Sequence, residues 1–121
     1  MASSPRKVLV VEDEALVAML VEDALLDAGF DVMGPAATVA EAMALLEAAA
    51  PDAVVLDLNL AGETSAPVAD VLARRGIPYV IATGYGASGL PSGHQNAMVL
   101  AKPYDPAELT AMLGRICRQA A

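Results

Sequence analysis

Residues 53–57 read Ala-Val-Val-Leu-Asp, an apolar run that stops at the carboxylate of Asp57. Three more apolar runs end at polar residues: residues 8–11 before Glu12 and Asp13, residues 79–82 before Thr83, and residues 98–101 before Lys102. Uninterrupted apolar runs of four or five residues are typical of strands buried on both faces of a parallel sheet. Because the C-terminal ends of parallel strands meet at one edge of the sheet, these polar side chains are predicted to share one crevice.

The segments between these runs have helical patterns. Residues 15–28 carry apolar side chains at i, i+4 spacing, such as Leu16 and Leu20, and the pattern ends at Gly29. A capping box that starts at Thr38 predicts a helix to about residue 50, just before Pro51.

Two further helices are predicted. Residues 65–75 form one, which ends before Gly76. The other begins at Asp105, which precedes a proline, and carries an apolar stripe as far as Cys117.

With a short strand predicted at residues 30–34, five strands alternate with helices along the chain. This order predicts an α/β three-layer sandwich with right-handed crossovers. Residues 84–96 occupy the slot of the fourth helix, yet they contain several glycines and a proline. Each interior glycine costs a helix about 1 kcal/mol and an interior proline about 3 kcal/mol, so this helix is predicted to be short or irregular.

Composition limits the class of protein. The 121 residues suffice for one domain, and residues 1–6 are predicted to be a flexible tail. The formal net charge of −8 argues against nucleic-acid binding through a basic face. The chain has a single cysteine and no apolar stretch long enough for a signal peptide or a membrane span, so a cytoplasmic protein is expected.

The residue types at the strand ends suit one chemistry. Mg²⁺ prefers hard oxygen ligands and keeps several waters, so Glu12, Asp13 and Asp57 suffice to hold it. With a cation present, Asp57 can act as a nucleophile and form an acyl phosphate. Lys102 would neutralise charge on the phosphoryl group, and the Thr83 hydroxyl would donate a hydrogen bond to it.

Each of these residues also has a plainer interpretation. Glu12 and Asp13 could cap the first helix, Asp57 could be a turn residue, Thr83 an ordinary strand residue and Lys102 a surface charge. These interpretations do not explain why all five stand at the ends of strands.

With these residues in this order, the chain resembles a response-regulator receiver domain of two-component signalling over essentially its whole length. The resemblance rests on Glu12-Asp13, Asp57, Thr83 and Lys102-Pro103. It implies one receiver domain over residues 1–121, with a flavodoxin-like sheet of order 2-1-3-4-5.

The resemblance also implies roles for individual residues. Asp57 would accept a phosphoryl group from a sensor histidine kinase with Mg²⁺ as cofactor. The backbone carbonyl of Asn59 would complete the Mg²⁺ shell, and the bond between Lys102 and Pro103 would be cis. Such a domain catalyses only its own phosphorylation and dephosphorylation. It would then signal by contact with an unknown downstream protein or drain phosphate from the kinase.

The sequence Ile81-Ala82-Thr83-Gly84-Tyr85-Gly86 is similar to the FATGUY subgroup of receivers, with isoleucine in place of the phenylalanine. Members of this subgroup are typically stand-alone alphaproteobacterial receivers that pair with HWE or related kinases. Most receivers carry Tyr or Phe three residues before the lysine, and Val99 stands there. The switch is therefore assigned to Thr83, Gly84 and Tyr85.

Two other functions fit parts of the pattern. One is a pseudo-receiver that binds partners without phosphorylation, which Val99 keeps open. The other is a Mg²⁺-dependent phosphatase with an aspartyl nucleophile, similar to the haloacid dehalogenases; position 59, an asparagine, does not match that family's Asp-x-Asp motif.

The remaining residues receive structural interpretations. His94, in the glycine-rich segment, is expected to be solvated and not a ligand. Five methionines on apolar segments are expected to fill the core: Met19, Met33, Met43, Met98 and Met112.

Overall fold

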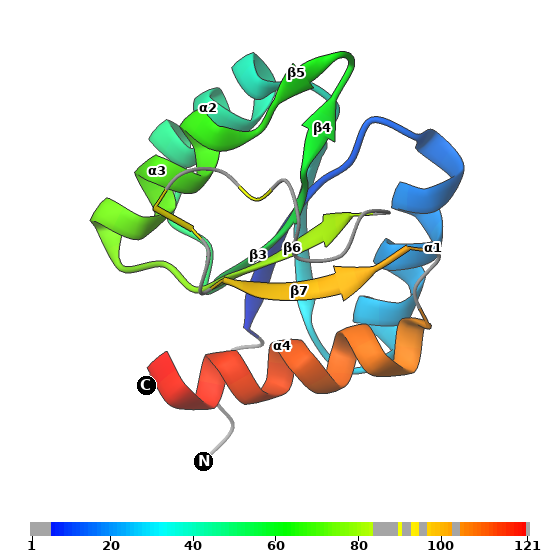
Figure 1. Cartoon of the computed structure of the whole chain (residues 1–121). Helices are drawn as coiled ribbons and strands as arrows, with labels where there is room; N and C mark the ends of the chain where they lie inside the picture. Colours follow the sequence, from blue (N-terminus) through cyan, green and yellow to red (C-terminus); the bar gives the residue numbers. More distant parts are fainter. Residues whose placement is uncertain (1–5, 84–89, 91–92, 95–96, 103–104, 121) are drawn as a thin grey trace.

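The computed structural model describes residues 6–83, 90, 93–94, 97–102 and 105–120. Its centre is a parallel sheet in the order β2-β1-β3-β6-β7 (Figure 1). The strands are β1 (Lys7–Val11), β2 (Asp31–Ala36), β3 (Ala53–Asp57), β6 (Tyr79–Thr83) and β7 (Met98–Ala101). The predicted order 2-1-3-4-5 is confirmed, because β4 and β5 lie outside this sheet.

Helices cover both faces of the sheet, as predicted. The helices α1 (Ala15–Asp27) and α4 (Pro106–Ala120) pack on one face, and α2 (Val39–Ala48) and α3 (Ala66–Arg75) pack on the other (Figure 1). Side chains alternate between the two faces along a strand. In β1, Val8 and Val10 therefore join the core under α1 and α4, and Leu9 and Val11 join the core under α2 and α3.

The predicted helix starts are confirmed by their hydrogen bonds. The Thr38 hydroxyl accepts the N–H of Glu41 at 3.1 Å, and the Glu41 carboxylate accepts the N–H of Ala37 at 2.8 Å. At α4, the Asp105 carboxylate accepts the N–H of Ala107 at 2.9 Å. These bonds satisfy N–H groups that have no partner inside the helix.

One element was not predicted. Strands β4 (Asn59–Leu60) and β5 (Glu63–Thr64) form a short antiparallel hairpin directly after β3. Its two central residues, Ala61 at φ 51° and Gly62 at φ 85°, both have positive φ, as in the type I′ turn that joins twisted strands. The sequence signal for this turn is weak, because alanine is uncommon at positive φ.

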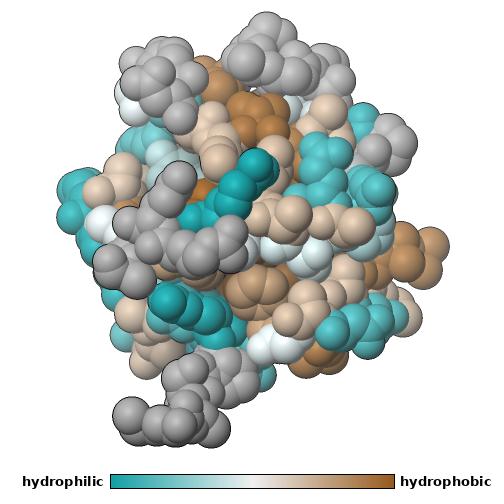
Figure 2. All heavy atoms as spheres, turned by 90° about the horizontal axis from the view of Figure 1, so that it is seen from below, coloured by the Kyte–Doolittle hydropathy of each residue, from teal (hydrophilic) through white to brown (hydrophobic). Residues whose placement is uncertain are grey.

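The outer face of α1 also differs from the prediction. Leu16, at 76% exposure, and Leu20 lie on the surface, and so does Leu26. Figure 2 shows brown hydrophobic residues protruding at the right-hand edge, the side on which Figure 1 draws α1. Met19 is exposed as well, so its assignment to the core was wrong. The other four predicted core methionines are partly buried against the two cores.

Most of residues 84–96 lie outside the described residues, so the predicted irregular fourth helix stays a prediction. The same holds for the bond between Lys102 and Pro103 and for the predicted tail, of which only Arg6 is described. Among the described helices, none combines the length and the apolar character needed to cross a membrane.

Candidate functional site

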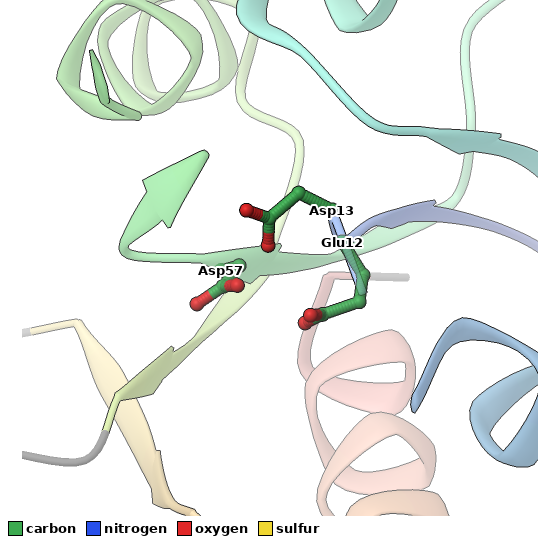
Figure 3. A group of neighbouring side chains, drawn as sticks. All are labelled: Glu12, Asp13 and Asp57. Carbon is green, nitrogen blue, oxygen red and sulfur yellow. The ribbon is translucent and has the colours of Figure 1, made fainter. Parts of the chain in front are cut away.

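The C-terminal edge of the sheet carries the predicted residues. Glu12 and Asp13 follow β1, Asp57 ends β3, Thr83 ends β6 and Lys102 follows β7. The pairing of parallel strands brings these positions to one edge, as expected for strands that run in one direction. Figure 3 shows the side chains of Glu12, Asp13 and Asp57 around a common space.

Three carboxylates form the acidic part of this site. One oxygen from each of Glu12, Asp13 and Asp57 lies within 4.8 Å of the others. Glu12 and Asp57 are buried, at 4% and 6% exposure, whereas Asp13 is exposed. Two buried carboxylates and a third at the rim repel one another, and a nearby cation reduces this repulsion.

Lys102 supplies one positive charge to this cluster. Its Nζ lies 3.0 Å from Oδ2 of Asp57 and 3.3 Å from Oε2 of Glu12. Burial acts to lower the pKa of Lys102, but the hydrogen bonds and the attraction to the two carboxylates outweigh it, and the pKa is raised. Lys102 is therefore an ammonium at neutral pH.

Asp57 has an unusual acidity. Burial raises the pKa of its carboxyl from 3.8 to about 7, the neighbouring Glu12 acts in the same direction, and Lys102 opposes both. One ammonium therefore does not offset burial and the second carboxylate. A divalent cation beside Asp57 would favour the ionised form.

Backbone bonds fix where the strand ends stand relative to each other. The N–H of Lys102 donates to the carbonyl of Thr83 at 2.9 Å, and the N–H of Leu58 donates to the carbonyl of Ala82 at 3.0 Å. Thr83, at 2% exposure, lies at the end of the strand next to Asp57. The lysine, the threonine and the aspartate are thus held by the register of three adjacent strands.

The donor set fits a small hard cation. Carboxylate oxygens are the ligands that Mg²⁺ prefers, and one exposed ligand leaves the site open to water and to a phosphoryl group. Asn59, whose carbonyl was assigned to the same shell, lies two residues beyond Asp57 on β4. Gly84 and Tyr85 lie outside the described residues.

A groove adjoins the site. It has a volume of about 390 Å³ and runs between α1 and α4. Its lining is mainly apolar, with Glu14 and Lys102 as the charged residues. The lining residues are Glu14, Val17, Leu20, Val21, Lys102, Pro106 and Leu109.

A second polar cluster was missed by sequence reasoning. His94 is 5% exposed, so the expectation of a solvated histidine was wrong. Its Nε2 lies 2.7 Å from Oδ1 of Asp70 on α3, and its Nδ1 is hydrogen-bonded to the hydroxyl of Tyr79 on β6. Tyr79 begins β6 whereas Thr83 ends it, so the cluster lies away from the carboxylates. The partners stand 24 and 15 residues from His94, and no local pattern signals such a contact.

Comparison with known proteins agrees with this geometry. Residues 8–114 match the family model of the response regulator receiver domain. The solution structure of SdrG from Sphingomonas melonis Fr1 is 40% identical, covers 93% of this chain and 97% of its own, and superposes with a TM-score of 0.80.

Two curated proteins are also similar over most of this chain. The transcriptional regulatory protein PdtaR of Mycobacterium tuberculosis is 31% identical over an alignment of 112 residues that covers 89% of this chain and 55% of PdtaR. The phyllosphere-induced regulator PhyR of Methylorubrum extorquens is 30% identical over an alignment of 118 residues that covers 94% of this chain and 44% of PhyR. The chain therefore spans about half the length of these curated relatives.

Proposed function

The chain belongs to the response regulator receiver domain family, and on that premise we propose that Asp57 accepts a phosphoryl group from a histidine kinase in a Mg²⁺-dependent reaction. One observation carries the proposal: the buried Asp57 carboxylate lies 3.0 Å from the Lys102 ammonium and beside the carboxylates of Glu12 and Asp13. Receiver domains generally bind Mg²⁺ at such an acidic pocket, which this chain has.

The reaction moves one phosphoryl group between two proteins. A carboxylate oxygen of Asp57 forms a bond to phosphorus as the P–N bond to the kinase imidazole breaks, and the electron pair of that bond stays on the nitrogen. The Lys102 ammonium contacts Asp57 and is placed to neutralise charge on a phosphoryl oxygen. Glu12, Asp13, Asp57 and the carbonyl of Asn59 would hold Mg²⁺, and the bound ion would supply further positive charge to the phosphoryl oxygens.

Thr83 is proposed to respond to phosphorylation of Asp57. Its hydroxyl can donate a hydrogen bond to a phosphoryl oxygen on Asp57, the neighbouring strand end. Val99, on the edge strand β7, pairs with Ile81 of β6. It has no aromatic ring that could rotate when Thr83 moves toward the phosphoryl group. The response is therefore assigned to Thr83 with Gly84 and Tyr85.

The exposed face of α1 supports a protein as phosphodonor. Large apolar side chains such as Leu16, Met19 and Leu20 are exposed there, and α1 contains acidic but no basic residues. Exposed apolar patches commonly mark protein interaction sites. The proposed occupant is a kinase helix with an apolar row and basic flanks, from a sensor kinase of the HWE or a related class, as the resemblance to FATGUY receivers implies.

The role of α1 can be separated from the chemistry. Changing Leu16 and Leu20 to serine should slow transfer from the kinase, while labelling by acetyl phosphate should stay as in the wild type. Equal slowing of both reactions would instead place these leucines in the reaction itself.

The output of the domain is proposed to run through protein contact. Residues 1–121 would act as a single cytoplasmic receiver that engages a downstream protein or drains phosphate from the kinase. Receivers are generally signalling domains and not metabolic enzymes, and the phosphatase alternative has no support in this family. The pseudo-receiver alternative differs in one property, the absence of phosphorylation.

Labelling with a small phosphodonor tests the proposal. Acetyl phosphate with Mg²⁺ should add the mass of one phosphoryl group to the wild-type chain and to Asp27→Asn, a matched change of an exposed aspartate on α1. Asp57→Asn should gain nothing. Labelling that persists in Asp57→Asn would contradict the assignment, and no labelling of the wild type would favour the pseudo-receiver.

A further inference from the structure

The β4–β5 hairpin contacts one of the three carboxylates of the site. The backbone N–H of Ala61, at the hairpin turn, donates to Oδ2 of Asp13 at 2.9 Å. The two residues are 48 positions apart in the chain. Figure 1 shows the connection from β1 to α1, which contains Asp13, passing beside the hairpin.

The base of the hairpin is anchored to the rest of the domain. Ser65 is fully buried, and both its N–H and its hydroxyl donate to the carbonyl of Leu58, at 2.9 and 3.0 Å. The N–H of Leu58 in turn donates to the carbonyl of Ala82 on β6. These bonds close the two ends of the hairpin and attach it to the sheet.

The middle of the hairpin is anchored by packing. Leu60 is fully buried in the core under α2 and α3, and it pairs with Glu63 across the hairpin. The turn itself is exposed. The position of the Ala61 N–H is thus set by a buried leucine, a buried serine and the strand pairing, although the contact with Asp13 is at the surface.

The turn that carries this N–H has an unusual backbone conformation. Ala61 has φ 51°, in the left-handed region that residues with a Cβ seldom adopt. Gly62, which follows, adopts positive φ at no steric cost. The N–H that reaches Asp13 thus belongs to a residue in an unfavourable backbone conformation.

We infer that the β4–β5 hairpin is a positioning element for Asp13, and that the Ala61 N–H orients this carboxylate for a divalent cation. Asp13 is exposed, so packing does not hold its side chain as it holds those of the buried Glu12 and Asp57. An N–H donor on one oxygen fixes the orientation of the group and leaves acceptor positions for a metal. The inference rests on the proposed role of Asp13 as a Mg²⁺ ligand.

An amide-to-ester replacement at position 61 tests this contact. Incorporation of lactic acid, the α-hydroxy analogue of alanine, removes the N–H and keeps the methyl group and the shape of the turn. Because loss of an outer-shell partner lowers metal affinity by roughly 10- to 100-fold, Mg²⁺ titration by calorimetry should show at least about tenfold weaker binding. Ala61→Gly keeps the N–H and favours positive φ, so it should bind Mg²⁺ like the wild type.

Two further measurements separate positioning from mere structure. The metal-free ester protein should keep its thermal midpoint close to that of the wild type, because Leu60 and Ser65 still hold the hairpin. In an Asp13→Ala background, which has no side-chain acceptor for the N–H, the ester should have no further effect on Mg²⁺ affinity. Equal Mg²⁺ affinity of ester and wild type, or an undiminished ester effect with Asp13→Ala, would overturn the inference.

The same experiment distinguishes failure of the inference from failure of the proposed function. If the wild-type chain bound no Mg²⁺, or if Asp13→Asn bound it unchanged, the proposed role of Asp13 would be wrong. If Mg²⁺ affinity depended on Asp13 but not on the ester, only the role of the hairpin would be wrong.

Discussion

Replacing Asp57 by asparagine should stabilise the metal-free protein, and the gain should grow with pH. Burial, assisted by Glu12 and opposed by Lys102, raises the pKa of Asp57 from 3.8 to about 7. Between these pH values the folded state keeps a proton that the unfolded state has lost, so the free energy of unfolding falls as pH rises. Each pKa unit corresponds to about 1.4 kcal/mol. The difference between the two pKa values therefore limits the gain in the free energy of unfolding to roughly 4 kcal/mol above pH 7. The asparagine side chain has nearly the same shape and does not titrate.

Chemical denaturation in EDTA, followed by circular dichroism, measures this effect. From about pH 4 to about pH 8, the difference in the free energy of unfolding between Asp57→Asn and the wild type should rise from near zero to a few kcal/mol. Asp27→Asn, at an exposed site on α1, should show little change across the same range. A difference for Asp57→Asn that does not vary with pH, or a variant less stable than the wild type at pH 8, would refute the reasoning.

Two other predictions concern the metal and the second polar cluster. Mg²⁺ should raise the thermal midpoint of the wild type, because it binds the folded carboxylate cluster, and Asp13→Asn should shrink that rise. Identical melting in EDTA and in Mg²⁺ would contradict the site. His94→Ala should lower the free energy of unfolding by about 1–3 kcal/mol, because it leaves Tyr79 and Asp70 without their shared partner. Denaturant unfolding measures this loss, Tyr79→Phe should lose less, and unchanged stability of His94→Ala would show that the cluster contributes nothing.

The sheet and the positions of the candidate site residues were predictable because they depend on local patterns. Runs such as residues 53–56 are apolar without interruption, as expected for strands covered on both faces. Once the strands are parallel, the topology alone places Asp57, Thr83 and Lys102 at one edge. The starts of α2 and α4 followed from side chains that cap their own helices.

The features that were not predictable depend on contacts between distant segments. The hairpin after β3 requires a positive φ at Ala61, which the residue type does not favour, and burial of Leu60 under two helices compensates for it. The burial of His94 depends on Asp70 and Tyr79, which belong to other elements. On α1, Leu16 and Leu20 have the spacing of a core stripe, and only the docking of the helix shows that Val21 and Leu25 are the buried pair.

The most direct test of the central claim is to locate the phosphoryl group on the chain. After incubation with acetyl phosphate and Mg²⁺, borohydride reduces an aspartyl phosphate to homoserine, and peptide mass spectrometry then identifies the converted residue. We predict conversion at Asp57 alone, dependent on Mg²⁺. Conversion at Asp13 or at any other carboxylate, with Asp57 unchanged, would contradict the account.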